Sequence, residues 1–198
     1  MLRRSPSLLL RTFAAKAAAA PGELPPKMLK KIDSFVQTAK IMRSLQAATS
    51  DYTIIHNPTR IPDEAPWPED FRGKFLATTD IRKLQREGKL PPAAATELEK
   101  LNMVWDVNAY KWQMKIEALT AYKAVYGHTD VPYSFVVPDQ DTRWPRDTWG
   151  QALGKQVSNI LKEFHTSKRV KNQVYNNPTP RQLQLIALDF NWDRSGFS

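Results

Sequence analysis

The chain has 198 residues, of which 41% are hydrophobic and 25% charged, and its net charge at pH 7 is +9. This composition indicates a folded protein with a hydrophobic core rather than a disordered chain, and the length allows one or two small domains. Because the sequence has no cysteine and no run of about 18 apolar residues, it excludes disulfides, cysteine-ligated zinc and, as an expectation, a membrane-spanning helix.

The N-terminal segment, residues 1–22, has the composition of a mitochondrial transit peptide. It reads MLRRSPSLLLRTFAAKAAAAPG, contains four basic residues and no acid, and places Leu2, Leu9 and Phe13 on one side of a helix. Its apolar run, residues 8–10, is too short for a secretory signal. We therefore expect a leader that directs the protein to the mitochondrial matrix, the alternative being a disordered basic tail.

The remainder of the chain aligns with itself at an offset of 77 residues. Trp67-Pro68 aligns with Trp144-Pro145, and after ten extra residues the segment 98–106 (LEKLNMVWD) aligns with 185–193 (LIALDFNWD). Such self-similarity predicts two copies of one supersecondary unit, at 27–106 and 107–193, followed by a tail at 194–198. In this register Trp105 and Trp192 are expected to be equivalent core residues.

The first unit, 27–106, is predicted to contain three helices. Apolar residues at helical spacing run from Ile32 to Leu45 and predict the first helix. The second helix is expected to carry Phe71, Phe75, Leu76 and Leu84, with Asp80 interrupting its apolar face. After the turn REGKLPP, Leu98 and Leu101 indicate a third helix.

The second unit, 107–193, follows the same plan. A first helix is expected to end at Gly127, and residues 128–145 to be extended because they contain Pro132, Pro138 and Pro145. A second apolar stripe runs from Trp149 to Phe164, and residues 168–178 (KRVKNQVYNNP) are interpreted as a basic loop. For the third helix we expect Thr179 as the N-cap with Gln182 as its capping-box partner. Its inward-facing residues are predicted to be Leu183, Ile186 and Ala187.

The fold class predicted from these patterns is all-α, with two tandem three-helix modules and extended Pro-rich segments. The second module resembles the helicase-associated domain, a small all-helical module that occurs in tandem. The similarity rests on Gly127-His128, Val131-Pro132, Leu153-Gly154 and the ending LIALDFNWD. The first module resembles the family through GKLPPAAATELEKLNMVWD, but it lacks the Gly-His pair and is the more divergent copy. The resemblance implies a protein that binds nucleic acid.

The sequence lacks the motifs of an ATPase or another enzyme. There is no G-x-x-x-x-G-K-[ST] phosphate-binding loop, and no acid, base and nucleophile converge in the pattern. His128 with Asp130 could form an acid–base or metal pair, but the imidazole after Gly127 is better interpreted as capping or packing at the helix end. We therefore expect no catalytic residue, metal, cofactor or small-molecule substrate.

Two groups of basic residues are the candidate polyanion contacts, with solvated helix faces as the alternative interpretation. One group lies at 82–89 and the other at 155–171; their members are Arg82, Lys83, Arg86, Lys89, Lys155, Lys162, Lys168, Arg169 and Lys171. Arg82, Arg86 and Lys89 are predicted to share a helix face. Trp67 and Trp144, each followed by proline, are expected to be partly exposed and to offer stacking surfaces for bases.

The function predicted from the sequence is that of a non-catalytic accessory protein that binds RNA or DNA backbone through basic loops. The alternative is a structural subunit or assembly factor of a large mitochondrial complex, such as the ribosome, that binds protein instead. Nucleic-acid binding predicts a continuous positive face, whereas a structural subunit predicts an exposed apolar patch.

Overall fold

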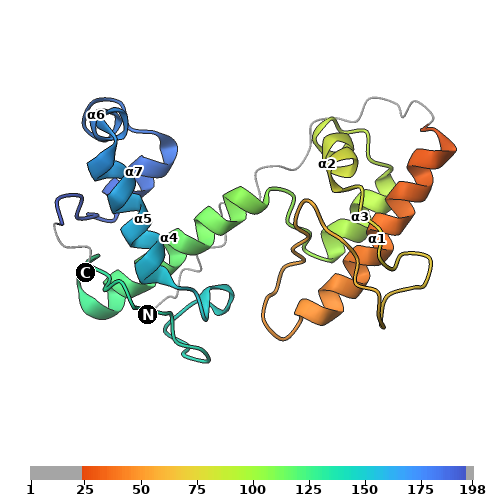
Figure 1. Ribbon diagram of the computed structural model, residues 1–198, viewed down its shortest axis with the longest axis horizontal. Coiled ribbons are helices and arrows are strands. Elements are labelled where there is room, and N and C mark those ends of the chain that lie inside the picture. Colours follow the sequence, from red (N-terminus) through yellow and green to blue (C-terminus); the bar gives the residue numbers. More distant parts are fainter. Residues whose placement is uncertain (1–23, 195–198) are drawn as a thin grey trace, which may run out of the picture. The chain divides into compact units, whose positions relative to one another are not determined.

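The computed structural model describes residues 24–194, so the predicted leader at 1–22 and most of the tail lie outside it. Within this range the secondary structure consists of seven α-helices and one short 3₁₀ helix, without any strand (Figure 1). The prediction of an all-α fold is therefore confirmed. None of the helices described is both long and apolar enough to cross a lipid bilayer. The described chain divides into two compact units, unit 1 (24–47 and 52–105) and unit 2 (48–51 and 106–194).

Unit 1 contains three helices around one hydrophobic core. They are α1 (Pro26–Gln46), α2 (Thr78–Arg86) and α3 (Pro92–Lys100), and both α1 and α3 begin with proline, whose missing N–H costs nothing in a first turn. Each helix contributes a fully buried side chain to the core: Phe35, Ile81 and Leu98.

The long segment 52–77 of unit 1, which we call strap 1, is held by backbone hydrogen bonds between residues that are not in helices. Ile61 pairs with two residues across it: its N–H donates to the Lys74 carbonyl, and its carbonyl accepts from the Gly73 N–H. This pairing keeps residues 71–77 out of the helix. The prediction that Phe71, Phe75 and Leu76 lie on the second helix is therefore wrong; Phe75 is 70% exposed, whereas Leu76 is buried.

The supposed flaw at Asp80 also disappears in the structure. Ile81, one position later, is the residue of α2 that faces the core, and it is fully buried. Asp80 lies at the partly exposed edge of α2, where its carboxylate forms an ion pair with Lys31 of α1 at 2.6 Å. The one-residue difference arises because α2 begins only at Thr78, after strap 1.

Unit 2 begins with the long helix α4 (Val107–Tyr126). The side chain of Asp106 accepts hydrogen bonds from the N–H groups of Asn108 and Ala109 and caps its start. Gly127 adopts the left-handed conformation with φ 81° and ends the helix, as the sequence predicts. The remaining elements are η1 (Arg146–Thr148), α5 (Leu153–Thr166), α6 (Lys168–Asn176) and α7 (Pro180–Ala187).

The segment 168–178, interpreted from the sequence as a basic loop, instead forms helix α6 over most of its length. Ser167 caps this helix, its hydroxyl accepting a hydrogen bond from the Val170 N–H. Val170 and Val174, one turn apart, are buried against the fully buried Phe164 of α5. These two valines hold a short, otherwise polar helix against the core. Unit 2 therefore has four α-helices, whereas the sequence predicted three.

Helix α7 starts as predicted but turns a different face to the core. The capping box is present, with the Thr179 hydroxyl and the Gln182 side chain each accepting from the other residue's backbone N–H. Leu185 is the buried residue of this helix, at 1% exposure. The prediction that Leu183, Ile186 and Ala187 face inward is wrong, since all three are exposed.

Unit 2 is held together by a close approach between α5 and the segment 127–152, which we call strap 2. The Gly154 N–H donates to the Phe135 carbonyl at 3.0 Å, and a Cβ at this position would overlap the backbone carbonyls of Pro132 and Tyr133. Only a residue without a side chain allows the backbones to come so near. The Leu153-Gly154 pair is thus a packing requirement of this unit.

Replacement of Gly154 by alanine tests this contact, because helix propensity and steric clash change the free energy of unfolding in opposite directions. Helix propensity alone predicts that Ala stabilises α5 by about 1 kcal/mol relative to Gly. The clash with strap 2 predicts that Gly154→Ala destabilises unit 2 by about 1–3 kcal/mol or more, because backbone atoms cannot move aside as a side chain can. Urea unfolding measures the difference, with Ser158→Ala on the same helix as a control near neutrality. A stabilised Gly154→Ala variant would contradict this packing.

Candidate nucleic-acid interface

The basic residues of unit 1 are largely engaged within the unit. Arg82 is half-buried, and its Nη2 donates to the Ile55 carbonyl of strap 1 at 2.6 Å, so this guanidinium fastens the strap to α2. Lys83 and Lys89 both pair with the carboxylate of Glu87, at 3.9 and 2.9 Å. The hydrogen bond from Lys89, with the nearby positive charges, lowers the pKa of Glu87 despite some opposing desolvation.

The predicted face of Arg82, Arg86 and Lys89 does not exist as a helix face. Arg86 is the last residue of α2, and Gly88, with φ 67°, turns the chain before Lys89. Arg82 therefore lies within α2, Arg86 at its end and Lys89 beyond it. Because Lys83 and Lys89 share the single carboxylate of Glu87, their charge is offset only in part.

The basic residues of unit 2 are arranged differently. Lys155 and Lys162 project from α5, while α6 carries Lys168, Arg169 and Lys171 at its start, with no acidic residue in its first turn. All five side chains are exposed, and none forms an ion pair with a carboxylate of the described residues. We call this group the α5–α6 cations. The absence of counter-charges leaves these cations available to a polyanion.

An exposed aromatic side chain accompanies the α5–α6 cations. Tyr175, one turn beyond Lys171 on α6, is 57% exposed and meets the edge of the buried Phe164 at a ring-centroid distance of 5.8 Å. The Lys171 ammonium lies 5.6 Å from the centroid of the same Phe164 ring. The sequence did not single out Tyr175, because its stretch was interpreted as a loop; the i, i+4 spacing of Val170 and Val174 was the signal that could have placed it on a helix.

Trp67 and Trp144 are not stacking surfaces, contrary to the prediction. Their side chains are 5% and 2% exposed, because each strap folds its indole onto its own core. Trp144 packs against Phe135 at 5.5 Å and Tyr122 at 6.4 Å between ring centroids. The proline after each tryptophan stops helix formation but does not keep the indole in solvent.

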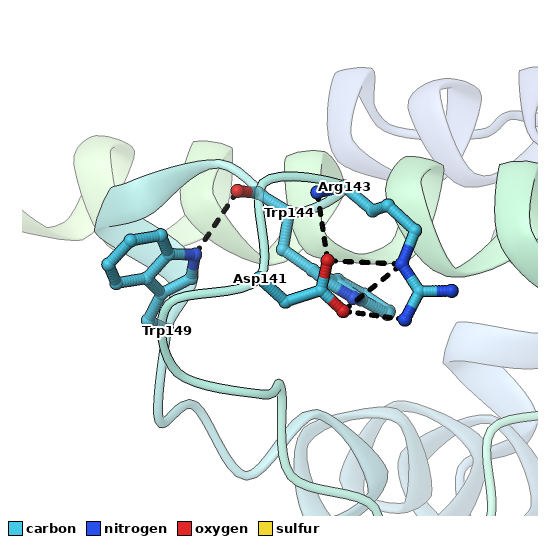
Figure 2. Close-up of polar contacts among 4 residues, drawn as sticks. All are labelled: Asp141, Arg143, Trp144 and Trp149. Atoms are coloured by element: carbon cyan, nitrogen blue, oxygen red, sulfur yellow. Dashed lines mark hydrogen bonds and ion pairs between the residues drawn. The ribbon is translucent and has the colours of Figure 1, made fainter.

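The turn that delivers Trp144 to the core is closed by its neighbours (Figure 2). Asp141 accepts from the backbone N–H and the guanidinium of Arg143, with the shortest contact at 2.6 Å, and this pairing lowers the pKa of the carboxyl group. The Trp149 indole N–H donates to the Trp144 carbonyl at 3.2 Å. Arg143 is thus committed to the turn and does not join the uncompensated cations.

His128 and Asp130 build the turn after α4. The Asp130 N–H donates to His128 Nδ1 at 3.2 Å, and the imidazole meets the ring of Tyr122 edge-on at 5.7 Å. The Asp130 carboxylate accepts from the Asn191 side chain at 3.0 Å. The packing role preferred from the sequence is confirmed, with Tyr122 as the aromatic partner.

One acidic group of unit 2 has a raised pKa. Glu117 of α4 is about half-buried; desolvation raises its pKa above the usual value of 4.5, the nearby Asp147 adds to this, and a hydrogen bond from Gln113 opposes it. Two neighbouring carboxylates in a partly dry environment repel each other. Ionisation of Glu117 in the folded unit therefore costs stability.

In the comparisons with known proteins, one family model matches part of the chain. Residues 109–193 match the family model of the helicase associated domain. The matched segment runs from the first turns of α4 past the end of α7 and contains the Gly127-His128, Leu153-Gly154 and Trp192-Asp193 pairs. The resemblance seen in the second module is confirmed; the match contains a single copy of the domain. No curated protein and no solved structure matches the chain.

Glu117 predicts a pH dependence of stability. Its folded-state pKa is raised, so the cost of ionising it in the fold is present in full above that pKa and is lost as the pH falls towards the unfolded value of about 4.5. Glu117→Gln removes the charge and keeps an acceptor for Gln113. We expect the variant to melt at a higher temperature than the parent at pH 7 and the difference to shrink at pH 4. A constant difference across this range would contradict the assignment.

Replacing a lysine in the first turn of α6 by an acidic residue is predicted to stabilise unit 2. Cations in a first turn oppose the helix macrodipole, each by about 0.3–1 kcal/mol at low salt. Lys168→Glu should therefore raise the melting temperature of unit 2, and Lys168→Gln should raise it less. The matched control is Lys162→Glu, which lies late in α5 and beside Glu163 and should give no rise. If added salt does not diminish the gain, its origin is not electrostatic.

Proposed function

We propose that this protein is a non-catalytic accessory protein of the mitochondrial matrix that binds the backbone of RNA or DNA. The binding surface is formed by the α5–α6 cations of unit 2. The observation that carries the proposal is that these five exposed charges have no carboxylate partner within the described residues and lie in the segment that matches the helicase associated domain.

The stability of the fold does not account for these charges. Lys168 and Arg169 occupy the first turn of α6, where the positive end of the macrodipole repels them. In unit 1, by contrast, Lys83 and Lys89 share Glu87 as a counter-charge. A bound polyanion would supply to α6 the negative charge that the unit itself lacks.

The arrangement favours recognition of the backbone over recognition of sequence. Lysine and arginine on exposed helix faces reach phosphate oxygens, and such contacts fix position without distinguishing bases. Tyr175, exposed beside them, offers a ring on which an unpaired base can stack, and stacking tolerates any base. We therefore favour single-stranded nucleic acid, bound with weak sequence preference.

The assignment to the mitochondrial matrix rests on residues 1–22. Their content of arginine, serine and alanine, without an acid, is typical of a transit peptide. Removal of the leader would leave a chain that is still mildly basic, which suits a polyanionic partner.

We further propose that residues 27–106 form a second, divergent copy of the domain. Support comes from hydrogen bonds that recur in both units: Met103 N–H to Leu98 carbonyl and Phe190 N–H to Leu185 carbonyl, each 3.1 Å. Two further pairs of residues in the same register share left-handed backbones: Gly73 and Gly150, and Asn102 and Asp189.

The copies differ in how their closing tryptophans pack. Trp105 stacks on Phe35 of α1 with ring centroids 6.3 Å apart, whereas Trp192 packs on Phe164 of α5 at 5.1 Å. The two indoles therefore have unlike neighbours, contrary to the expectation from the sequence. The difference follows from α6, whose buried valines pack with Phe164 and Trp192 and which has no counterpart in unit 1.

A second candidate function is favoured by helix α7. Leu183 and Ile186 are 51% and 40% exposed and, with Ala187, form an apolar stripe along the helix. Such a stripe suits a protein partner. The alternative proposal is accordingly a structural subunit or assembly factor of a large mitochondrial complex, such as the ribosome, that docks protein on α7.

Affinity for single-stranded RNA across a salt series tests the leading proposal. For the leader-free protein we expect log Kd to depend linearly on log salt concentration. The double variant Lys168→Ala/Arg169→Ala should bind more weakly and reduce the salt slope by about 0.7 for each phosphate that is no longer bound.

The matched control is Lys83→Ala/Lys89→Ala, which removes the same charge from residues already paired with Glu87. It should change affinity and slope much less. No binding at low salt would end the nucleic-acid proposal. Equal losses of affinity in the two double variants would mean that net charge, and not the α5–α6 surface, governs binding.

A further inference from the structure

A separate group of cations in unit 2 surrounds Trp112 on α4. The Lys115 ammonium and the Arg181 guanidinium each lie 5.1 Å from the centroid of this indole. The indole N–H donates to the Gln184 side chain at 2.5 Å, which fixes the ring between α4 and α7. Two helices thus bring two positive charges to one aromatic ring.

The charges of this group are not neutralised within the unit. Neither Lys115 nor Arg181 forms an ion pair with any carboxylate of residues 24–194, and the first turns of α4 and α7 contain no acid. Burial lowers the pKa of Lys115, and the charge of Arg181 lowers it further. The indole ring attracts both cations but carries no net negative charge.

The geometry of the group is set in advance. The Thr179–Gln182 capping box fixes the first turn of α7, which carries Arg181, and the Trp112–Gln184 hydrogen bond ties that helix to α4. Lys115 is half-buried, and its ammonium is restrained by the contact with the Trp112 ring. A ligand that binds both cations therefore meets charges that are already ordered, which reduces the entropic cost of binding.

We propose that Lys115 and Arg181, held by Trp112, form a phosphate-binding site that takes a phosphodiester group of a nucleic acid. The guanidinium supplies a fork of N–H donors that matches two phosphate oxygens, and the ammonium supplies a point charge. This inference rests on the proposed function and adds a second contact, on α4 and α7, to the one on α5 and α6. None of its three residues was a candidate binding residue from the sequence.

The test follows the Trp112 indole N–H by ¹H–¹⁵N NMR of the leader-free protein at constant ionic strength. Titration with inorganic phosphate, and then with a short single-stranded RNA, should shift this resonance saturably. Arg181→Gln should weaken the phosphate effect roughly tenfold or more, as expected for loss of a charged hydrogen bond. Lys115→Gln gives a second variant, and dispersed indole signals verify that each variant is folded.

Lys100→Gln is the matched control, because Lys100 is an exposed lysine of unit 1 paired with Glu97. It should leave the Trp112 titration unchanged. A Trp112 resonance that does not respond to phosphate, or that responds equally in Arg181→Gln, overturns the inference. A stronger response to polyglutamate than to RNA overturns it as well, since the partner would then be an acidic protein.

The two proposals fail separately in this experiment. If RNA binds through α6 while Trp112 is silent, the α5–α6 surface stands and this site does not. If inorganic phosphate shifts Trp112 but RNA neither binds nor shifts it, the nucleic-acid function falls and the phosphodiester assignment falls with it.

Discussion

The architecture of unit 2 depends on the contact between α5 and strap 2 at Gly154. Because no Cβ intervenes, the first turn of α5 lies directly on the carbonyls of Pro132 and Tyr133, and the Gly154 N–H bonds to Phe135. Strap 2 is thereby fixed across the core, into which it places the Trp144 side chain. α5 in turn presents Phe164, on which α6 packs through Val170 and Val174. The position of the α6 cations therefore depends on α5, whose own packing on strap 2 requires glycine at position 154.

The distribution of counter-charges gives the two units different characters. In unit 1, glutamates at 87 and 97 and an aspartate at 80 each take up nearby lysines. In unit 2, Arg143 and Lys123 are paired with aspartates, but the α5–α6 cations and the Trp112 group are left without carboxylate partners among the described residues. Cations without counter-charges repel one another and reduce the stability of the folded unit. Both proposals therefore assign to these cations an anionic ligand that supplies the missing negative charge.

The sequence predicts the fold class, the end of α4 and the start of α7 because these depend on local signals. Gly127 and the Thr179–Gln182 pair act within one turn, and each does in the structure what its residue type predicts. The failures concern long-range packing. Trp67 and Trp144 are buried because the straps fold back, Leu183 is exposed because Leu185 faces the core, and α6 forms because Phe164 offers a surface for two valines. The approach of Arg181 to Trp112, which is far from it along the chain, does not follow from residue spacing either.

In our proposal, unit 2 holds nucleic acid on the exposed side of α5 and α6. Chemical-shift mapping of the leader-free protein with a short single-stranded RNA tests this most directly, since every backbone amide reports its own surroundings. We predict that the largest changes fall on residues 168–175 and around Lys162. Changes concentrated on the apolar stripe of α7, or spread evenly over both units, would contradict it.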